Sequence, residues 1–270
     1  MIDTTATSPE FGVMTMAESP AAIERACGLA LSLDATGERV PRVILHPRDL
    51  PVPAGYFDMT IRMPADPYRG RWFYLNKLVH PYALSPFDRT LFIDSDVIVR
   101  RPIRNLVTRH FVGKPIALCV KHEPLDSTQT LGNHFTPKLF VEQFGTPLVQ
   151  NPDGGGHMYF ESGATTESIV ARALELVTCN EDLYHRISGN FGFVADELAL
   201  LAILTIDGIV LPAGLGAVHP VQPHDVDATV ADLLTGTVQT QAALFHFFGQ
   251  GKESESYSRL LASIPARWRG

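Results

Sequence analysis

A strand, a helix and a second strand follow one another directly at the beginning of the chain. Residues 11–17 form a short apolar run typical of a β-strand, and Ser19 and Pro20 after it are typical of a helix N-cap and a first helical residue. Apolar residues then recur at helical spacing up to Gly37, and the run at 41–46 predicts a second strand. Because strands joined through a helix run parallel, this unit predicts an α/β fold with a parallel sheet.

The rest of the chain continues this alternation, without an internal repeat or a low-complexity linker. Its 270 residues, 45% of them hydrophobic and 19% charged, are enough for a large core. Residues 121–153 and 212–240 are rich in turn residues, so we expect them to be less regular. We expect one domain over 1–270, with a mostly parallel central sheet flanked by helices. Further strands are predicted near 56–63 and at 90–93, 115–120 and 154–160, and helices over 71–83, 165–178 and about 194–205.

The charge balance limits the kinds of partner. The formal net charge is -7, from 29 acidic and 22 basic residues, which gives no electrostatic reason to expect a nucleic acid or a membrane surface as partner. A protein of this charge that handles an anionic ligand must concentrate positive charge locally or use a metal ion. No run approaches the roughly 18 apolar residues of a membrane span, so we expect a soluble, cytoplasmic protein.

The cysteines agree with that compartment. Cys27, Cys119 and Cys179 are odd in number, far apart and embedded in apolar runs. This pattern favours buried thiols in a reducing compartment over disulfides.

Two carboxylates interrupt an apolar stretch in the sequence RTLFIDSDVIVRRP, residues 89–102. Asp94 and Asp96 follow the predicted strand at 90–93, on the edge where open α/β sheets bind ligands. One interpretation is a solvated turn in which the acids cap local backbone. The apolar residues on both sides argue against solvation, and a buried carboxylate is costly unless it is paired or binds a cation. Mg²⁺ or Mn²⁺, with phosphate oxygens completing the shell, would suit these ligands.

Several blocks of sequence, in order, resemble glycosyltransferase family 8, the glycogenin-like and lipooligosaccharide galactosyltransferase-like enzymes. The blocks are LNKLVHPYALSPFDRTLFIDSDVIV, GGGHMYF, VADELAL and FHFFGQGK, and with FGVMTMA at the start they span nearly the whole chain. The resemblance implies a GT-A, Rossmann-like domain that uses a nucleotide-diphosphate sugar. It implies a flexible N-terminus at 1–10, a nucleotide-binding half at 11–120, and an acceptor-binding half with the metal-binding histidine segment at 121–270.

The resemblance assigns a cation site and its anionic ligand. Asp94, Asp96 and His246 would bind Mn²⁺ or Mg²⁺, and Lys77 and Lys252 would bind the donor diphosphate. Without the resemblance, a single histidine in an apolar run is more typical of a core residue, and the lysines would be ordinary solvated side chains.

Further donor-binding residues follow from the same motifs. Residues at the end of the first strand would hold the base and ribose, a residue between the two acids would offer its backbone to the ribose, and glycines would let the chain approach the sugar closely. The alternative for the glycines before 157 is a tight turn ahead of a strand, which is compatible. These residues are Thr15, Met16, Ala17, Ser95, Gly155, Gly156 and Gly249.

Asp196 and Glu197 match an Asp-Gln pair that in relatives holds donor hydroxyls and lies near the anomeric carbon. Because glutamate replaces glutamine here, we expect Glu197 to stabilise the reacting sugar electrostatically or to attack it. The alternative is that either acid caps the helix that contains LALLAIL. Two other departures are Gly154, where relatives have asparagine, and Glu253 with Ser254, where Pro-Trp is common.

The acceptor site is less well defined. Segments 121–153 and 212–225 would form it; His157, His219 and His224 are candidates, although a structural or surface role is favoured for each. The expected partners are a UDP-sugar and a soluble hydroxyl acceptor, and a homodimer is left open.

Three functions are compatible with these residues. The first is a metal-dependent retaining glycosyltransferase that gives an α-glycoside. The second is a sugar-1-phosphate nucleotidyltransferase, against which the absence of a basic, glycine-rich loop after 11–17 argues. The third is a non-catalytic nucleotide-sugar-binding scaffold. Gly154 and Glu197 make it conceivable, but the intact acidic, histidine and lysine set argues against it.

Overall fold

The computed structural model describes residues 10–47, 49–64, 75–128, 136–180, 182–183 and 196–267. The expectation of a flexible N-terminus, apart from Glu10, falls outside these residues. The same is true of the first residues of the helices predicted over 71–83 and about 194–205.

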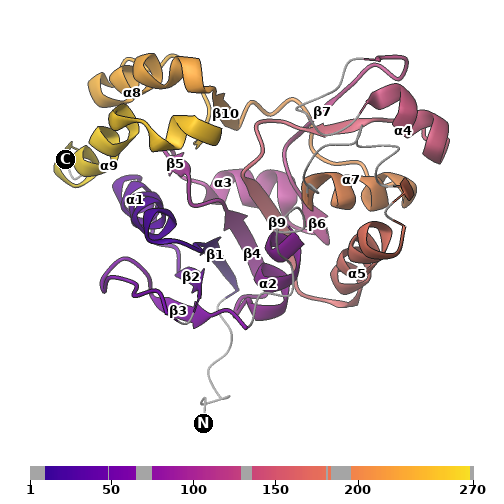
Figure 1. Ribbon diagram of the computed structural model, residues 1–270, viewed down its shortest axis with the longest axis horizontal. Helices are drawn as coiled ribbons and strands as arrows, with labels where there is room; N and C mark the ends of the chain where they lie inside the picture. The colour runs from indigo at the N-terminus through magenta and orange to yellow at the C-terminus, as the bar shows by residue number, and fades with distance from the viewer. Residues whose placement is uncertain are drawn as a thin grey trace, which may run out of the picture.

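The centre of the protein is a six-stranded sheet with the strand order β3-β2-β1-β4-β9-β6 (Figure 1). The first four strands in that order are mutually parallel, and β9 is antiparallel to both of its neighbours. The expected α/β fold with a mostly parallel central sheet is therefore confirmed. The strands are β1 (Phe11–Met16), β2 (Arg42–His46), β3 (Met59–Arg62), β4 (Arg89–Ile93), β6 (Ile116–Ala117) and β9 (His157–Glu161).

The predicted βαβ unit is present, and the local features that predicted it are seen in the structure. The hydroxyl of Ser19 accepts a hydrogen bond from the backbone N–H of Ala22 at 3.1 Å, which caps the helix α1 (Pro20–Ala35). Gly37, at φ 75°, provides the left-handed residue beyond its end. Strands β1 and β2 then pair in parallel, with Thr15 opposite Ile44.

Helices lie on both sides of the sheet. Figure 1 shows α1 on one side of the central strands and α5 and α7 on the other, while α9 packs against α1 and α8. No helix in the described part of the chain is long and apolar enough to cross a bilayer. The remaining helices are α2 (Asn76–Leu84), α3 (Arg104–Leu106), which continues into a π-helical turn (Val107–Phe111), α4 (Pro137–Phe144), α5 (Ala164–Cys179), α7 (Asp196–Ile206), α8 (Val226–Thr235) and α9 (Glu255–Arg267), with 3₁₀ turns at Pro223–Asp225 and η4 (Gly249–Glu253).

A second, three-stranded sheet joins distant parts of the chain. β5 (Val97–Val99) follows β4 after a short turn and pairs antiparallel with β11 (Leu244–Phe247), which pairs in parallel with β10 (Val218–Val221). In this register His246 lies opposite Val97. The turn that carries the two acids therefore lies beside the histidine strand. A third sheet contains only β7 (Val120–His122) and β8 (Gln150–Pro152).

Two predicted strands are shorter than expected. The run at 115–120 is divided, because β6 belongs to the central sheet while Val120 begins β7 in another sheet. The strand predicted at 154–160 starts only at His157. The three glycines before it all have positive φ, a conformation that cannot continue a strand.

The cysteine prediction is correct for two of the three residues. Cys27 and Cys119 are buried, and all three thiols are free. Cys179 is exposed, because it is the last residue of α5 and lies where the helix ends. The expectation that it is buried was wrong.

Candidate functional site

Asp94 and Asp96 lie in the turn between β4 and β5. The backbone N–H of Asp94 donates to the carbonyl of Gly156 at 2.9 Å, and that of Val97 donates back to the carbonyl of Asp94 at 3.2 Å. The chain does turn here, but the turn is not solvated, since the side chains are only 14% and 9% exposed. The two carboxylates therefore need positive partners.

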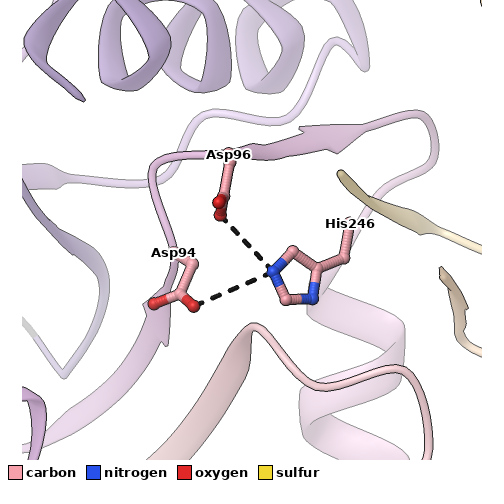
Figure 2. Close-up of side chains that lie close together, drawn as sticks. All are labelled: Asp94, Asp96 and His246. Carbon is pink, nitrogen blue, oxygen red and sulfur yellow. Dashed lines mark ion pairs between the residues drawn. The ribbon is translucent and has the colours of Figure 1, made fainter. Parts of the chain in front are cut away.

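His246 faces both carboxylates from β11 (Figure 2). Its Nε2 lies 3.4 Å from Oδ1 of Asp96 and 3.9 Å from Oδ2 of Asp94. One ligand atom from each of these three residues lies within 4.8 Å of the others. Nδ1 lies 2.8 Å from the carbonyl oxygen of Gly154 and donates its proton to it. Nε2 is therefore the nitrogen that can bind a cation.

The charges around His246 and Asp96 change the pKa values of both groups. Burial alone would lower the pKa of His246, but its hydrogen bond to Asp96 and the charges of both carboxylates raise it. Burial alone would raise the pKa of Asp96, but His246 and the nearby lysines lower it well below its usual range. The raised pKa favours a proton on the imidazole, and a cation at Nε2 would replace that proton.

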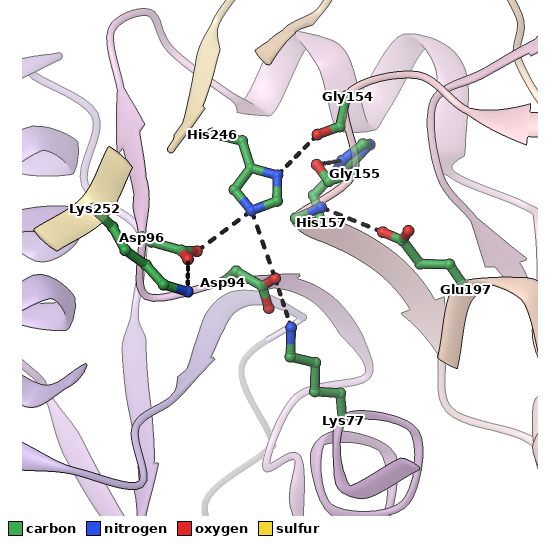
Figure 3. A network of polar contacts seen from close by, with 10 residues as sticks. Lys77, Asp94, Asp96, Gly154, Gly155, His157, Glu197, His246 and Lys252 are labelled. Atoms are coloured by element: carbon green, nitrogen blue, oxygen red, sulfur yellow. Dashed lines mark hydrogen bonds and ion pairs between the residues drawn. The ribbon is translucent and has the colours of Figure 1, made fainter. Parts of the chain in front are cut away.

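Two lysines pair with the two carboxylates (Figure 3). Nζ of Lys77, from α2, lies 2.7 Å from Oδ2 of Asp94, and Nζ of Lys252, from η4, lies 2.7 Å from Oδ2 of Asp96. The pKa of Lys77 would be lowered by burial, but Asp94 and other acids, including Asp196, raise it above its usual range. The expected local concentration of positive charge is therefore present beside the acids.

The glycines at 154–156 pack against side chains of the site. All three have positive φ. A Cβ on Gly156 would lie 2.7 Å from Nδ1 of His246, and one on Gly155 would lie 3.0 Å from Oε1 of Glu197. A Cβ on Gly154 would lie 2.6 Å from Cγ1 of Val218. The tight turn is therefore present. Within the described chain, the backbone of these glycines closely approaches side chains of the protein.

Asp196 and Glu197 form the first turn of α7. The backbone N–H of Gly156 donates to Oε1 of Glu197 at 3.3 Å. Burial and the neighbouring carboxylates raise the pKa of both acids. Backbone hydrogen bonding at Asp196 and Glu197 lowers the pKa of Asp196 and so opposes part of the effect of burial. Helix capping stays an alternative prediction for both acids. Both acids line a small cavity together with Asp94, Gly156 and His157.

The remaining expected donor-binding residues lie around this centre. Thr15, Met16 and Ala17 are buried at the carboxyl end of β1, the neighbour of β4. Among the described residues Oγ1 of Thr15 has no hydrogen-bond partner. Ser95 is half-buried between the two acids, and Gly249, at φ 48°, begins the turn that carries the second lysine.

The three histidines considered for the acceptor site have the structural or surface positions that were favoured. His157 is buried; its Nε2 accepts from the backbone N–H of Cys119 at 2.9 Å, and Nδ1 lies 3.0 Å from the carbonyl oxygen of Gly155. Burial is the main cause that lowers its pKa to about 4. His219 is half-buried against Phe245. The third, at 224, is exposed.

The topology, with an acidic pair after a central parallel strand, is that of the GT-A glycosyltransferase fold. Solved structures with this fold match almost the whole chain. The galactosyltransferase LgtC, in complex with donor and acceptor sugar analogs, is 15% identical with a TM-score of 0.57, and the match covers 96% of this chain and 99% of LgtC. An active-site Gln-to-Glu mutant of LgtC matches equally well.

Two other glycosyltransferases match over part of their length. GlyE of Streptococcus pneumoniae TIGR4 is 12% identical with a TM-score of 0.56, and the match covers 97% of this chain and 62% of GlyE. The bifunctional glycosyltransferase WbbM is 12% identical with a TM-score of 0.61, and the match covers 97% of this chain and 50% of WbbM. No family model and no curated protein matches the sequence. The expected GT-A fold is confirmed.

Proposed function

We propose that the protein is a metal-dependent, retaining glycosyltransferase. It transfers a hexose-type sugar from a UDP-sugar to a hydroxyl group of a soluble acceptor and gives an α-glycoside. The observation that carries the proposal is the convergence of Asp94, Asp96 and His246 on one point, with ligand atoms within 4.8 Å of one another. Two carboxylates and an imidazole form a ligand set that suits Mn²⁺ or Mg²⁺ and leaves room for phosphate oxygens.

The ligand atoms of the site fit such a cation. Asp94 and Asp96 supply hard oxygen ligands, and the bond from Nδ1 of His246 to the carbonyl of Gly154 orients the ring so that Nε2 faces them. A bound divalent cation would neutralise negative charge on the leaving diphosphate. Lys77 and Lys252 lie beside these ligands and would bind the same diphosphate through charge-assisted hydrogen bonds.

The acids on α7 would act on the sugar. Glu197 lies against the glycine turn and lines a cavity that Asp94 also lines. This position supports a role in stabilising positive charge on the reacting sugar. By its motif it stands where relatives have glutamine. The LgtC mutant with glutamate in place of an active-site glutamine has the same residue type in the same fold. Asp196, the first residue of α7, would hold donor hydroxyl groups.

The donor and acceptor would meet above the glycine turn at 154–156. We assign residues 11–120 to nucleotide binding and 121–270 to acceptor binding and the histidine segment. LgtC has been solved with donor and acceptor sugar analogs, which supports a site of this kind in the shared fold. The UDP base, the retaining outcome and the cytoplasmic location are inferred from the sequence motifs and composition.

Calorimetric titration with UDP tests the proposal. The titration is made with Mn²⁺ and again with EDTA, with GDP and dTDP beside it, on the wild type, Asp96→Asn and His246→Ala. Glu253→Gln is the matched control, because it removes a carboxylate that is exposed and adjacent to Lys252. We expect Mn²⁺-dependent UDP binding that the two site variants abolish and the control retains.

Turnover separates the enzyme from a binding scaffold. Hydrolysis of UDP-sugars, followed by transfer to acceptors, is expected for the wild type and is strongly reduced in Glu197→Ala. Mn²⁺-dependent binding without any turnover would favour the scaffold, and no nucleotide binding at all would refute the proposed function.

A further inference from the structure

We propose that Lys77 and Lys252 are placeholders for the cation. In the cation-free protein they hold the two carboxylates, and they move to the donor diphosphate when the cation binds. The proposal rests on the proposed function, because it describes how that same site would stay assembled before the cation binds.

The contact of Lys77 is to the oxygen of Asp94 that faces His246. Its Nζ lies 2.7 Å from Oδ2 of Asp94, and this same oxygen is the one 3.9 Å from Nε2 of His246. An oxygen that faces the third ligand is the one positioned to share a cation with it. The ammonium group and a divalent cation would therefore compete for one atom.

Lys252 occupies a different position on the second acid. Its Nζ lies 2.7 Å from Oδ2 of Asp96, while Nε2 of His246 lies 3.4 Å from the other oxygen, Oδ1. Figure 3 shows this lysine and Lys77 reaching the acids from different elements. Because Lys252 contacts Oδ2 while Oδ1 faces the imidazole, we expect Lys252 to compete with the cation through charge repulsion and Lys77 to compete directly.

Burial makes both pairs necessary before a cation binds. The carboxylates of Asp94 and Asp96 are 14% and 9% exposed, so leaving them ionised without partners would be costly. Lysine suits this task, because a compact charge on a flexible stem can move without any backbone change. A divalent cation placed among these groups would add positive charge next to two ammonium groups, which opposes its binding when no anion is present.

A diphosphate removes this conflict. Its oxygens can accept the displaced ammonium groups and also complete the cation's coordination shell. The cation and the nucleotide should therefore each bind weakly alone and strengthen one another, and this coupling must be reciprocal. A consequence specific to this geometry is that removal of Lys77 changes the two affinities in opposite directions.

The test measures Mn²⁺ binding without nucleotide, from the free Mn²⁺ signal in electron paramagnetic resonance. The proteins are the wild type, Lys77→Met, Lys252→Met, Lys77→Arg and, as control, Lys121→Met, which removes an exposed lysine. We expect Lys77→Met to bind Mn²⁺ about tenfold more tightly than the wild type, within the usual range of ligand coupling, and Lys252→Met to show a smaller gain. Lys77→Arg and the control should resemble the wild type. In saturating Mn²⁺ both methionine variants should bind UDP more weakly.

Each outcome is decisive. Circular dichroism confirms that the variants are folded. Lys252→Met remains informative if Lys77→Met does not fold, because the side chain of Lys252 is the more exposed of the two lysines. If the wild type binds Mn²⁺ with UDP but neither methionine variant binds Mn²⁺ alone more tightly, the placeholder proposal is wrong while the proposed function stands. If no protein binds Mn²⁺ with or without UDP, both are wrong.

Discussion

A Cβ on Gly156 would lie 2.7 Å from Nδ1 of His246, so the histidine has its present position only because residue 156 has no side chain. Gly154, two residues earlier, supplies the carbonyl that accepts the proton of Nδ1. The glycine turn before β9 is therefore the backbone support of the imidazole, and its effect on the cation site can be tested directly.

Gly156→Ala is expected to weaken both folding and cation binding. At φ 71° an alanine costs about 1–2 kcal/mol, and here it must also displace the His246 ring. We expect the free energy of unfolding in urea to fall by more than this amount and Mn²⁺ affinity with UDP to fall at least about tenfold, the equivalent of 1.4 kcal/mol. Gly37→Ala is the matched control, because φ is 75° and no atom lies within 4 Å of the added Cβ. An equal loss of stability in both variants, with Mn²⁺ binding retained, would show that the contact has no role.

The raised pKa of Glu197 predicts a stability that depends on pH. Burial, then Asp196 and Asp94, raise this pKa from 4.5 to about 7. The folded state therefore holds the proton more tightly than the unfolded state, so the associated stability is present below pH 4.5 and is lost as pH rises through 7. In EDTA, we expect the free energy of unfolding of the wild type to fall by roughly 1–3 kcal/mol relative to that of Glu197→Gln between pH 4.5 and 8. Each unit of pKa difference between the folded and unfolded states corresponds to about 1.4 kcal/mol. A constant difference between the two unfolding free energies over this range would contradict the prediction.

His157 is expected to matter for stability through two buried hydrogen bonds. It accepts from the N–H of Cys119 and donates to the carbonyl of Gly155. His157→Phe keeps the aromatic ring and removes both bonds, so we expect a loss of about 2 kcal/mol or more in urea unfolding. His219→Phe is the control, since that ring is half-buried against Phe245 and makes no comparable pair of bonds among the described residues. Similar losses in the two variants would argue against the special role of His157.

The parts of the fold that depend on residues close together in the sequence were predictable. Ser19, Pro20 and Gly37 define the ends of α1 through capping and backbone conformation, which act over a few residues. The strand at 154–160 was predicted too long, because its first three residues are glycines with positive φ, and the strand starts only at His157.

The site itself was only partly predictable. His246 and Val97 lie opposite each other on paired strands that are far apart in the sequence, and no local pattern encodes that pairing. Only the family motifs suggested that the histidine and Asp96 belong together. The motifs also assigned Lys77 to a diphosphate, and they gave no indication that it pairs with Asp94 in the cation-free protein.

Ser32 is a stability determinant that the sequence did not indicate. Its hydroxyl is fully buried on α1, donates to the carbonyl of Leu29 at 2.7 Å and accepts from the N–H of Val99 at 3.0 Å. This bond attaches α1 to β5, the strand that follows the acidic turn. Ser32→Ala leaves the buried N–H of Val99 without that partner, so we expect a loss of about 1–3 kcal/mol in the free energy of unfolding.

Ser263→Ala is the control for this prediction, because among the described residues the hydroxyl of Ser263 donates within its own helix, to Leu260. A change within about 0.5 kcal/mol is expected there. Since β5 also holds one side of the acidic turn through its pairing with β11, Ser32→Ala should weaken Mn²⁺-dependent UDP binding less than it weakens folding. If urea unfolding shows the same stability for Ser32→Ala as for the wild type, the bond to Val99 does not support β5, and the sheet pairing alone positions the turn.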